Sequence, residues 1–250
     1  MKDVVMLGQF ADPAFPGPEE GVGTGIGMSP SAIAETLDFL RVHEAVDRII
    51  VSHPHGSASA AEVLNERPAV EPYSVAGQAD FVLVMQYALA RRGSCNDLLV
   101  IDQYFDGNTC ALNDACSREG GLAYFDGNRV IKDHRTSIDM IYIDVDASQA
   151  VRNICKTGKL KSMPRGILYQ TAGLYNVARP DVPTIFDAFQ RADNYNLPCP
   201  SAHDTLNRII NTAAYSNSPY CALDVQMDLR QNANLSVITG SEKLKAIFNV

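Results

Sequence analysis

Short apolar runs recur along the chain and predict its strands. Residues 4–7, 48–51 and 97–102 are runs of this kind in the first part of the chain, and residues 140–143 and 235–238 are two more in the later part. Near-continuous apolar runs of this length are typical of strands that are buried on both faces, as in a parallel sheet. We therefore predict a strand at each of the five places.

Helical spacing separates these runs. Ser29-Pro30 is a favourable helix start, because serine caps the N-terminus and proline suits the first helical position. Ile33, Leu37 and Leu40 follow at i, i+4 and i+7, which gives this helix one apolar face. Residues 76–90 and 184–192 also have helical character. Alternating strands and helices predict an α/β fold with one Rossmann-like, mostly parallel sheet and helices on both of its faces.

The loop between the first strand and the first helix is a candidate functional segment. Ligands of open α/β sheets bind at the carboxyl ends of the strands, and residues 8–28 leave the first strand at that end. The alternating glycines from Gly21 to Gly27 suit either a backbone nest for an anion or a plain glycine-rich loop. No lysine or arginine occurs between Lys2 and Arg41. This loop therefore offers no side-chain cation to a phosphate.

Composition narrows the class of protein. The 250 residues suit a single domain, and 46% hydrophobic with 20% charged residues is a globular composition. No apolar run approaches the roughly 20 residues that cross a bilayer, and the N-terminal run is too short for a signal peptide, so we expect a cytoplasmic protein with no membrane partner. The formal charge of −8 disfavours nucleic acid, because such binding depends on neutralising phosphates. The six cysteines contain no CxxC pair, so we expect them to be reduced packing residues.

Two groups of residues permit more than one interpretation. His53 and His55 flank a proline with no carboxylate or cysteine nearby, which is more typical of a loop than of a metal site. His203-Asp204 suggests a hydrolase dyad, but the chain has no G-x-S-x-G motif. Neither group indicates a function by itself.

One basic cluster lies in this otherwise acidic chain. It suits a solvated hairpin, and it also suits an arm that meets an anionic ligand or an acidic partner subunit. Five basic residues surround the turn-like Thr157-Gly158: Arg152, Lys156, Lys159, Lys161 and Arg165.

Several segments occur in an order that resembles a known enzyme family. Residues 32–40 and 46–51 resemble its first helix and second strand, and residues 75–79 resemble the turn that it places beside a nucleotide base. Leu99-Val100-Ile101-Asp102 resembles the strand that delivers an aspartate to the nucleotide phosphates, and residues 163–168 resemble an Asp-Arg-x-x-Leu segment. Over nearly its whole length the chain is similar to the methylerythritol-phosphate and ribitol-phosphate cytidylyltransferases, which are nucleotidyltransferases with a GT-A-like fold.

The resemblance implies a reaction and a site. The reaction is transfer of CMP from CTP to a small polyol phosphate or phosphonate, with Mg²⁺ as cofactor. Asp102 would hold the metal and contact phosphates, and Arg165 and Lys245 would be the other catalytic residues. The nucleotide would lie against five residues of the loops: Gly8, Gly25, Gly27, Ala76 and Gly77. Residues 1–250 would be a single domain, with a protruding β-hairpin arm at about residues 139–168 that forms a homodimer.

The sequence departs from the family where cations are needed. Relatives carry an arginine and a lysine in the first glycine-rich loop, whereas this loop has neither, and Asp80 stands where they have a base-side arginine. Attack on a nucleoside triphosphate depends on cations that neutralise developing charge. Two hypotheses therefore stay open: a divergent cytidylyltransferase, or a catalytically inactive member that serves as a partner subunit or a ligand-binding protein.

Overall fold

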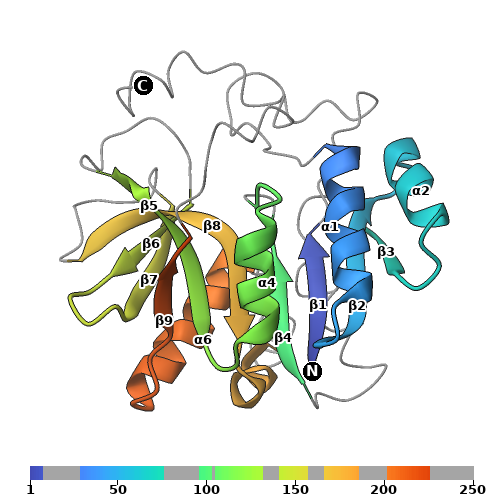
Figure 1. Cartoon of the computed structure of the whole chain (residues 1–250). Coiled ribbons are helices and arrows are strands. Elements are labelled where there is room, and N and C mark those ends of the chain that lie inside the picture. The colour runs from blue at the N-terminus through green and yellow to red at the C-terminus, as the bar shows by residue number, and fades with distance from the viewer. Residues whose placement is uncertain are drawn as a thin grey trace, which may run out of the picture.

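A computed structural model describes seven ranges of the chain (Figure 1). These are residues 1–7, 29–75, 96–102, 105–131, 141–156, 166–185 and 202–225. They contain one nine-stranded sheet with helices packed against it. The helix predicted at 76–90, most of the helix predicted at 184–192 and the strand predicted at 235–238 lie outside the described residues.

Four strands form the parallel half of the sheet. They are β1 (Lys2–Leu7), β2 (Val46–Pro54), β3 (Glu71–Val75) and β4 (Asp97–Ile101). Their order is β3-β2-β1-β4, and each neighbouring pair is parallel. The predicted parallel sheet is therefore confirmed, as are the strands predicted at 4–7, 48–51 and 97–102, which correspond to β1, β2 and β4. All four carboxyl ends lie at one edge, which we call the carboxyl edge, and the opposite edge is the amino edge (Figure 1).

Three further strands extend the sheet beyond β4. β8 (Ile167–Val177) runs antiparallel to β4 on one side and to β5 (Leu122–Ile131) on the other. β9 (Cys221–Asp224) runs parallel to β5. Two reversals of direction separate β4 from β5, so β5 also points toward the carboxyl edge.

A hairpin of β6 (Ile141–Val145) and β7 (Val151–Lys156) lies within the stretch where an arm is predicted. β6 confirms the strand predicted at 140–143, and it pairs with the first residues of β8. The described part of the hairpin is attached to its own chain, because Ala150 also bridges to Cys221 at the start of β9. Residues 157–165 lie outside the described residues, and dimerisation through an arm stays a prediction.

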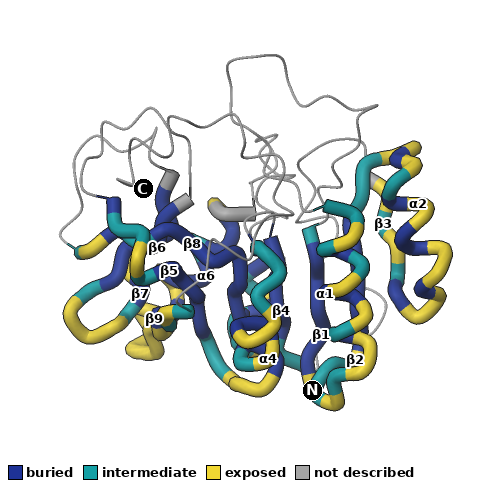
Figure 2. Tube along the Cα trace, turned by 45° about the horizontal axis from the view of Figure 1, so that its top comes forward, coloured by how far each residue is buried: buried dark blue, intermediate teal, exposed yellow. Residues whose placement is uncertain are grey.

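Helices cover both faces of the sheet. α1 (Pro30–Val42), α2 (Ala58–Asn65) and α4 (Thr109–Ser117) pack their apolar residues against one face, together with residues of β1, β2 and β4. α6 (Ala202–Tyr215) packs against the other face. Figure 2 shows the buried strands between helices whose outer surfaces are exposed. The predicted two-sided cover is therefore confirmed. In the ranges that the structure describes, no helix is long and apolar enough to span a membrane.

α1 begins as its sequence predicts. The Ser29 hydroxyl accepts a hydrogen bond from the Ala32 backbone N–H at 3.2 Å, and Pro30 occupies the first helical position. Ile33, Leu37 and Leu40 are all 0% exposed. The i, i+4, i+7 spacing therefore identified the buried face of this helix.

A buried lysine joins three strands at the amino edge. Lys2 of β1 donates from Nζ to Oδ1 of Asn176 in β8 at 3.0 Å, and its Nζ lies 3.8 Å from Oδ2 of Asp97 in β4. Asn176 in turn donates from Nδ2 to the carbonyl of Arg118, just after α4, at 2.9 Å. Burial lowers the pKa of Lys2, and the charge of Asp97 opposes that shift. This network fixes where β1, β4 and β8 begin or end.

Asp97 has two further partners at the same edge. It accepts from the backbone N–H of Arg179 at 2.8 Å and from that of Gly120 at 3.3 Å. Arg179 begins the short 3-10 helix η2 (Arg179–Asp181). The carboxylate therefore serves both as the counter-charge of Lys2 and as the anchor of two loops.

α6 covers the backbone of β7 with a side-chain hydrogen bond, and this contact generates a stability prediction. Asn207 accepts from the Ile154 backbone N–H at 2.8 Å. We expect Asn207→Ala to lower the free energy of unfolding by about 1–3 kcal/mol, because it leaves a partly buried N–H without its acceptor. The matched control is Asn211, which lies one turn further along α6 and is exposed. Asn211→Ala should change the free energy of unfolding by less than about 0.5 kcal/mol. Urea denaturation measures both, and equal losses would show that the hydrogen bond does not matter.

Candidate functional site

Asp102 lies at the carboxyl edge, directly after β4, and is 2% exposed. Its backbone N–H donates to the carbonyl of Gly173 in β8 at 2.9 Å, and its own carbonyl accepts from the Phe105 N–H at 3.1 Å. Gly173 has a φ of +74°, in the left-handed region that favours glycine. These contacts hold Asp102 at the junction of the parallel and antiparallel halves of the sheet. Its catalytic role stays a prediction.

The other predicted site residues lie outside the described residues. They are the nucleotide-binding candidates Gly8, Gly25, Gly27, Ala76 and Gly77 and the catalytic candidates Arg165 and Lys245. Asp102 is therefore the predicted site residue whose surroundings the structure describes.

The loop after Asp102 leads into α4. Asp106 accepts from the Asn108 backbone N–H at 2.9 Å, and Asn108 caps α4 by accepting from the Ala111 N–H at 3.0 Å. Gly107 lies between them with a φ of +88°. These local hydrogen bonds direct the N-terminus of α4 toward the carboxyl edge and place a second aspartate, Asp106, four residues after Asp102.

A polar cluster that the sequence did not predict lies at the same edge, on β5, β8 and β9. Asp126 is 1% exposed, and its Oδ2 lies 3.1 Å from Nε of Arg129. Arg129 also donates from Nη1 to Oε1 of Gln170 at 2.9 Å. Asp224, at the end of β9, accepts from the Gly127 backbone N–H at 2.9 Å. We call Asp126, Arg129, Gln170 and Asp224 the β5 cluster.

Burial shifts the pKa values of both members of the ion pair in this cluster, Asp126 and Arg129. Burial raises the pKa of Asp126, although the Asn128 N–H and the charge of Arg129 oppose the shift. Burial also lowers the pKa of Arg129, against the charges of Asp126, Tyr142 and Asp106. Neither charge is fully compensated by its partner. Ionisable groups in this condition are concentrated at functional sites.

The two histidines after β2 are engaged in local contacts. Nδ1 of His53 lies 3.1 Å from the carbonyl of Pro54, and Nδ1 of His55 lies 3.0 Å from the hydroxyl of Ser74. In the described part of the chain, no three histidine, cysteine, aspartate or glutamate side chains are grouped so that they could hold a metal ion. His203 lies in α6, and its side chain is not among those that the structure describes.

Asp102 and Asp106 supply the kind of donor that Mg²⁺ prefers. Mg²⁺ is usually bound through one or two carboxylates, with substrate phosphates and water completing its ligands. Two carboxylates in one loop at the carboxyl edge suit an ion that shares its ligands with phosphates. They do not make a site that binds a metal without substrate.

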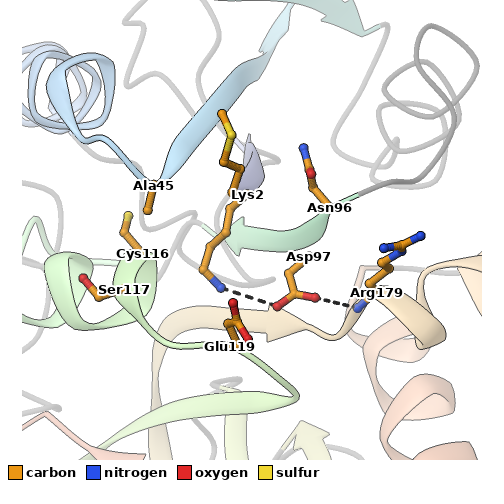
Figure 3. Close-up of a pocket in the computed structure, with 9 residues that line it drawn as sticks. Lys2, Ala45, Asn96, Asp97, Cys116, Ser117, Glu119 and Arg179 are labelled. Atoms are coloured by element: carbon orange, nitrogen blue, oxygen red, sulfur yellow. Dashed lines mark hydrogen bonds and ion pairs between the residues drawn. The ribbon is translucent and has the colours of Figure 1, made fainter.

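A pocket of about 320 Å³ lies at the opposite, amino edge (Figure 3). Figure 3 shows Lys2 directed at Asp97, with Glu119 beside them and the backbone of Arg179 on the far side. Two basic side chains, Lys2 and Arg179, and two acidic ones, Asp97 and Glu119, line the pocket. The side-chain charges therefore balance, and they do not favour an anion. This pocket therefore differs in both place and charge from a triphosphate site.

Comparison with known proteins gives a clear result for the fold alone. No protein-family model matches the sequence, and no curated protein matches it either. Solved structures do match. The chain is similar to CTP:phosphocholine cytidylyltransferase from Streptococcus pneumoniae, with 11% identity, a TM-score of 0.57 and 90% of each chain covered. It is also similar to inositol-1-phosphate CTP transferase from T. maritima, with 9% identity, a TM-score of 0.53 and coverage of 95% of this chain and 96% of that chain.

The chain has the cytidylyltransferase fold. The resemblance inferred from its scattered segments is thereby confirmed at the level of architecture. At identities this low the likeness does not transfer a substrate or an activity. Within this fold, Asp102 and the β5 cluster both lie at the carboxyl edge, on opposite sides of β8.

Two aspartates in and after β6 differ in environment, and this difference generates a pH prediction. Asp144 is 6% exposed, its Oδ1 is buried without a hydrogen-bond partner, and burial raises its pKa. Asp146 accepts from the hydroxyl and the N–H of Ser148 and from the Ala150 N–H, which lowers its pKa to about 2.

A raised pKa in the folded state means that the charged carboxylate opposes folding above that pKa. We expect Asp144→Asn to raise the melting temperature at pH 7, with the gain shrinking as the pH falls toward 4 and the wild type becomes protonated. Asp146→Asn should lower the melting temperature at pH 7. A carboxylate whose pKa is lowered in the folded state stabilises the fold at pH values above the ordinary pKa of aspartate. Thermal melts of both variants from pH 7 to pH 3 measure these effects. Shifts of the same sign at pH 7 would contradict the assignment.

Proposed function

We propose that the protein is a divergent nucleotidyltransferase of the cytidylyltransferase type, which transfers CMP from CTP to a small polyol phosphate or phosphonate. The observation that carries the proposal is the position of Asp102, at the carboxyl end of β4 in a sheet with the cytidylyltransferase fold. Both of the similar solved structures are of enzymes named for their use of CTP. Ligands of open α/β sheets bind at this edge.

The proposed reaction is one displacement at phosphorus. An oxygen of the acceptor phosphate forms a bond to the α-phosphorus of CTP, the bond to the β-phosphate oxygen breaks, and pyrophosphate leaves with that electron pair. Catalysis of such a step is mainly positioning and charge stabilisation, so it needs no covalent intermediate on the protein.

The chain's own part in this proposal is to hold and orient the substrates. The backbone of Asp102 is fixed by its contacts to Gly173 and Phe105, which place the residue at the carboxyl end of β4. Asp102, with Asp106 in the same loop, would hold Mg²⁺ together with the phosphates. A bound Mg²⁺ supplies charge neutralisation on phosphate oxygens. Arg165 and Lys245 are proposed as further phosphate contacts.

The alternative function is a catalytically inactive member of the same fold, which serves as a partner subunit or binds a ligand without turnover. The specific observation in its favour is the absence of lysine and arginine between Lys2 and Arg41. A homodimer through the arm is part of both proposals. Light scattering on the purified protein tests the predicted homodimer, and a monomeric mass would contradict it.

Thermal stability with nucleotides tests the binding step that the enzyme proposal requires. We expect CTP with Mg²⁺ to raise the melting temperature more than UTP, GTP or ATP does. A ligand at 100 times its dissociation constant stabilises the folded state by about 2.7 kcal/mol, which is readily measured. If none of the four nucleotides changes the melting temperature, the enzyme proposal fails.

Turnover is tested by pyrophosphate release from CTP in the presence of polyol phosphates. We expect Asp102→Asn to lower the rate by about 100-fold or more, because it removes a charge at the reacting phosphates. Asp47→Asn is a suitable control, since Asp47 is an exposed aspartate at the start of β2. Equal rates in the wild type and Asp102→Asn would show that Asp102 is not the reaction centre.

A further inference from the structure

The shape of β5 gives Arg129 an unusual position. Asp126 pairs with Gln170 and Val130 pairs with Tyr169, so the three residues 127–129 lie opposite a single peptide step of β8 and form a bulge. Bulges beside active sites serve to redirect side chains. Here the bulge turns Arg129 back toward Asp126 and Gln170, and its side chain is 13% exposed.

The bulge is fixed from both sides. The Gly127 N–H donates to Oδ1 of Asp224 at 2.9 Å, and the Asn128 N–H donates to Oδ1 of Asp126 at 3.0 Å. A side chain at Gly127 would collide with the Asp224 carboxylate, so the residue has no room for one. Each carboxylate thus uses one oxygen to hold the backbone of the bulge. The position of Arg129 is therefore built by the surrounding chain.

The guanidinium is oriented by two neighbours. Nη1 donates to Oε1 of Gln170 at 2.9 Å, and the charge of Asp126 lies beside the group, with Oδ2 at 3.1 Å from Nε in an ion-pair contact. A planar guanidinium fixed in this way is well suited to an oxyanion with several oxygens, such as a phosphate. Burial also lowers the pKa of Arg129, which means that its carboxylate partner does not fully offset the cost of burying its charge. An anionic ligand would reduce that cost.

Stability does not account for this ion pair. Buried ion pairs add little to stability and are often replaceable by apolar side chains without loss. Burial disfavours the charged form of both Asp126 and Arg129. A buried ion pair of this kind, at the carboxyl edge of the sheet, suits a function better than a purely structural role.

Asp102 and Arg129 are both attached to β8, from opposite sides. The Asp102 N–H donates to the carbonyl of Gly173, and Gln170, which accepts from Arg129, lies three residues before Gly173 on the same strand. Asp106, in the loop after Asp102, acts electrostatically on both Asp126 and Arg129. The two groups therefore face one region, with Asp102 on the side of the parallel strands and Arg129 on the side of β5.

We propose that Arg129 binds the phosphate of the acceptor, and so supplies a cation that the loop of residues 8–28 lacks. This inference rests on the proposed function, because it assigns the second substrate of that reaction. The parallel half of the sheet, β1 to β4, is left for the nucleotide. Asp126 and Gln170 are positioning residues, which act by holding the guanidinium.

The test compares the wild type with three variants in two assays. The first variant is Arg129→Gln combined with Asp126→Asn, which removes both charges of the buried pair and so leaves no uncompensated carboxylate. The second is Arg129→Lys, which keeps the charge but loses the planar fork. The control is Arg118→Gln, since Arg118 is exposed and pairs with Asp114 of α4. Circular dichroism and urea denaturation confirm folding of each.

The first assay needs no turnover. Inorganic phosphate and ribitol 5-phosphate are the probes, and the readout is the rise in melting temperature. We expect a rise in the wild type and in Arg118→Gln, a smaller one in Arg129→Lys and none in the double variant. No rise in the wild type, or an equal rise in the double variant, overturns the inference.

The second assay measures pyrophosphate release. We expect the double variant to raise the KM for the acceptor by about 10- to 100-fold, the range expected for a lost charge-assisted hydrogen bond, and to change the KM for CTP by less than about twofold. A purely structural ion pair would change both values alike or neither, and that result overturns the inference.

The two proposals can fail separately. Turnover with an unchanged acceptor KM in the double variant would leave the enzyme function standing and remove Arg129 from it. Phosphate binding that depends on Arg129, in a protein that never releases pyrophosphate, would keep the anion site and remove the enzyme function.

Discussion

Lys2 lies at the amino edge of the sheet with its ammonium buried between Asp97 of β4 and Asn176 of β8. A buried ammonium requires acceptors and a counter-charge, so this contact fixes the start of β1, the start of β4 and the end of β8 against one another. β4 then runs five residues from Asp97 to Ile101. Asp102 therefore emerges at the opposite edge, about 16 Å from Asp97, at a level set by the pairing of β4 with β1 and β8.

The other half of the sheet, formed by β8, β5 and β9, places polar residues at the carboxyl edge through antiparallel pairing. β8 reverses the direction of the chain, so β5 again points toward the carboxyl edge and carries its bulge there. The parallel half supplies a carboxylate directly after a strand, and the mixed half supplies a buried guanidinium. The first loop has no lysine or arginine, whereas the described part of β5 brings Arg129 to the carboxyl edge.

The sequence predicted those parts of the fold that depend on local patterns. β1, β2 and β4 are continuous apolar runs, and α1 has both a serine cap and regular apolar spacing, so neighbouring residues were enough to identify them. β5 and β8 were not predicted, because Asp126-Gly127-Asn128 reads as a turn and Gln170 and Asn176 interrupt the apolar pattern of β8. Those polar residues are buried because their partners come from distant parts of the chain, 41 residues away for Gln170 and 174 for Asn176.

The candidate site divides in the same way. Asp102 could be placed from sequence, since it ends a recognisable strand. Arg129 could not, because its position depends on the pairing of β5 with β8 and on the carboxylate of Asp224 in β9. The one local signal was an arginine three residues after an aspartate, within a polar stretch between apolar residues, and a turn explains that pattern as well. Ion pairs across strands need the register, which single-sequence patterns do not contain.

The central claim is that nucleotide binds at the carboxyl edge beside Asp102. Amide hydrogen exchange with and without CTP and Mg²⁺ tests it most directly, because it reports binding at each segment whether or not turnover occurs. The account predicts slower exchange in residues 102–111, around Asp102 and the start of α4, and unchanged exchange around Lys2 and Asp97. Protection confined to the pocket at the amino edge would contradict it.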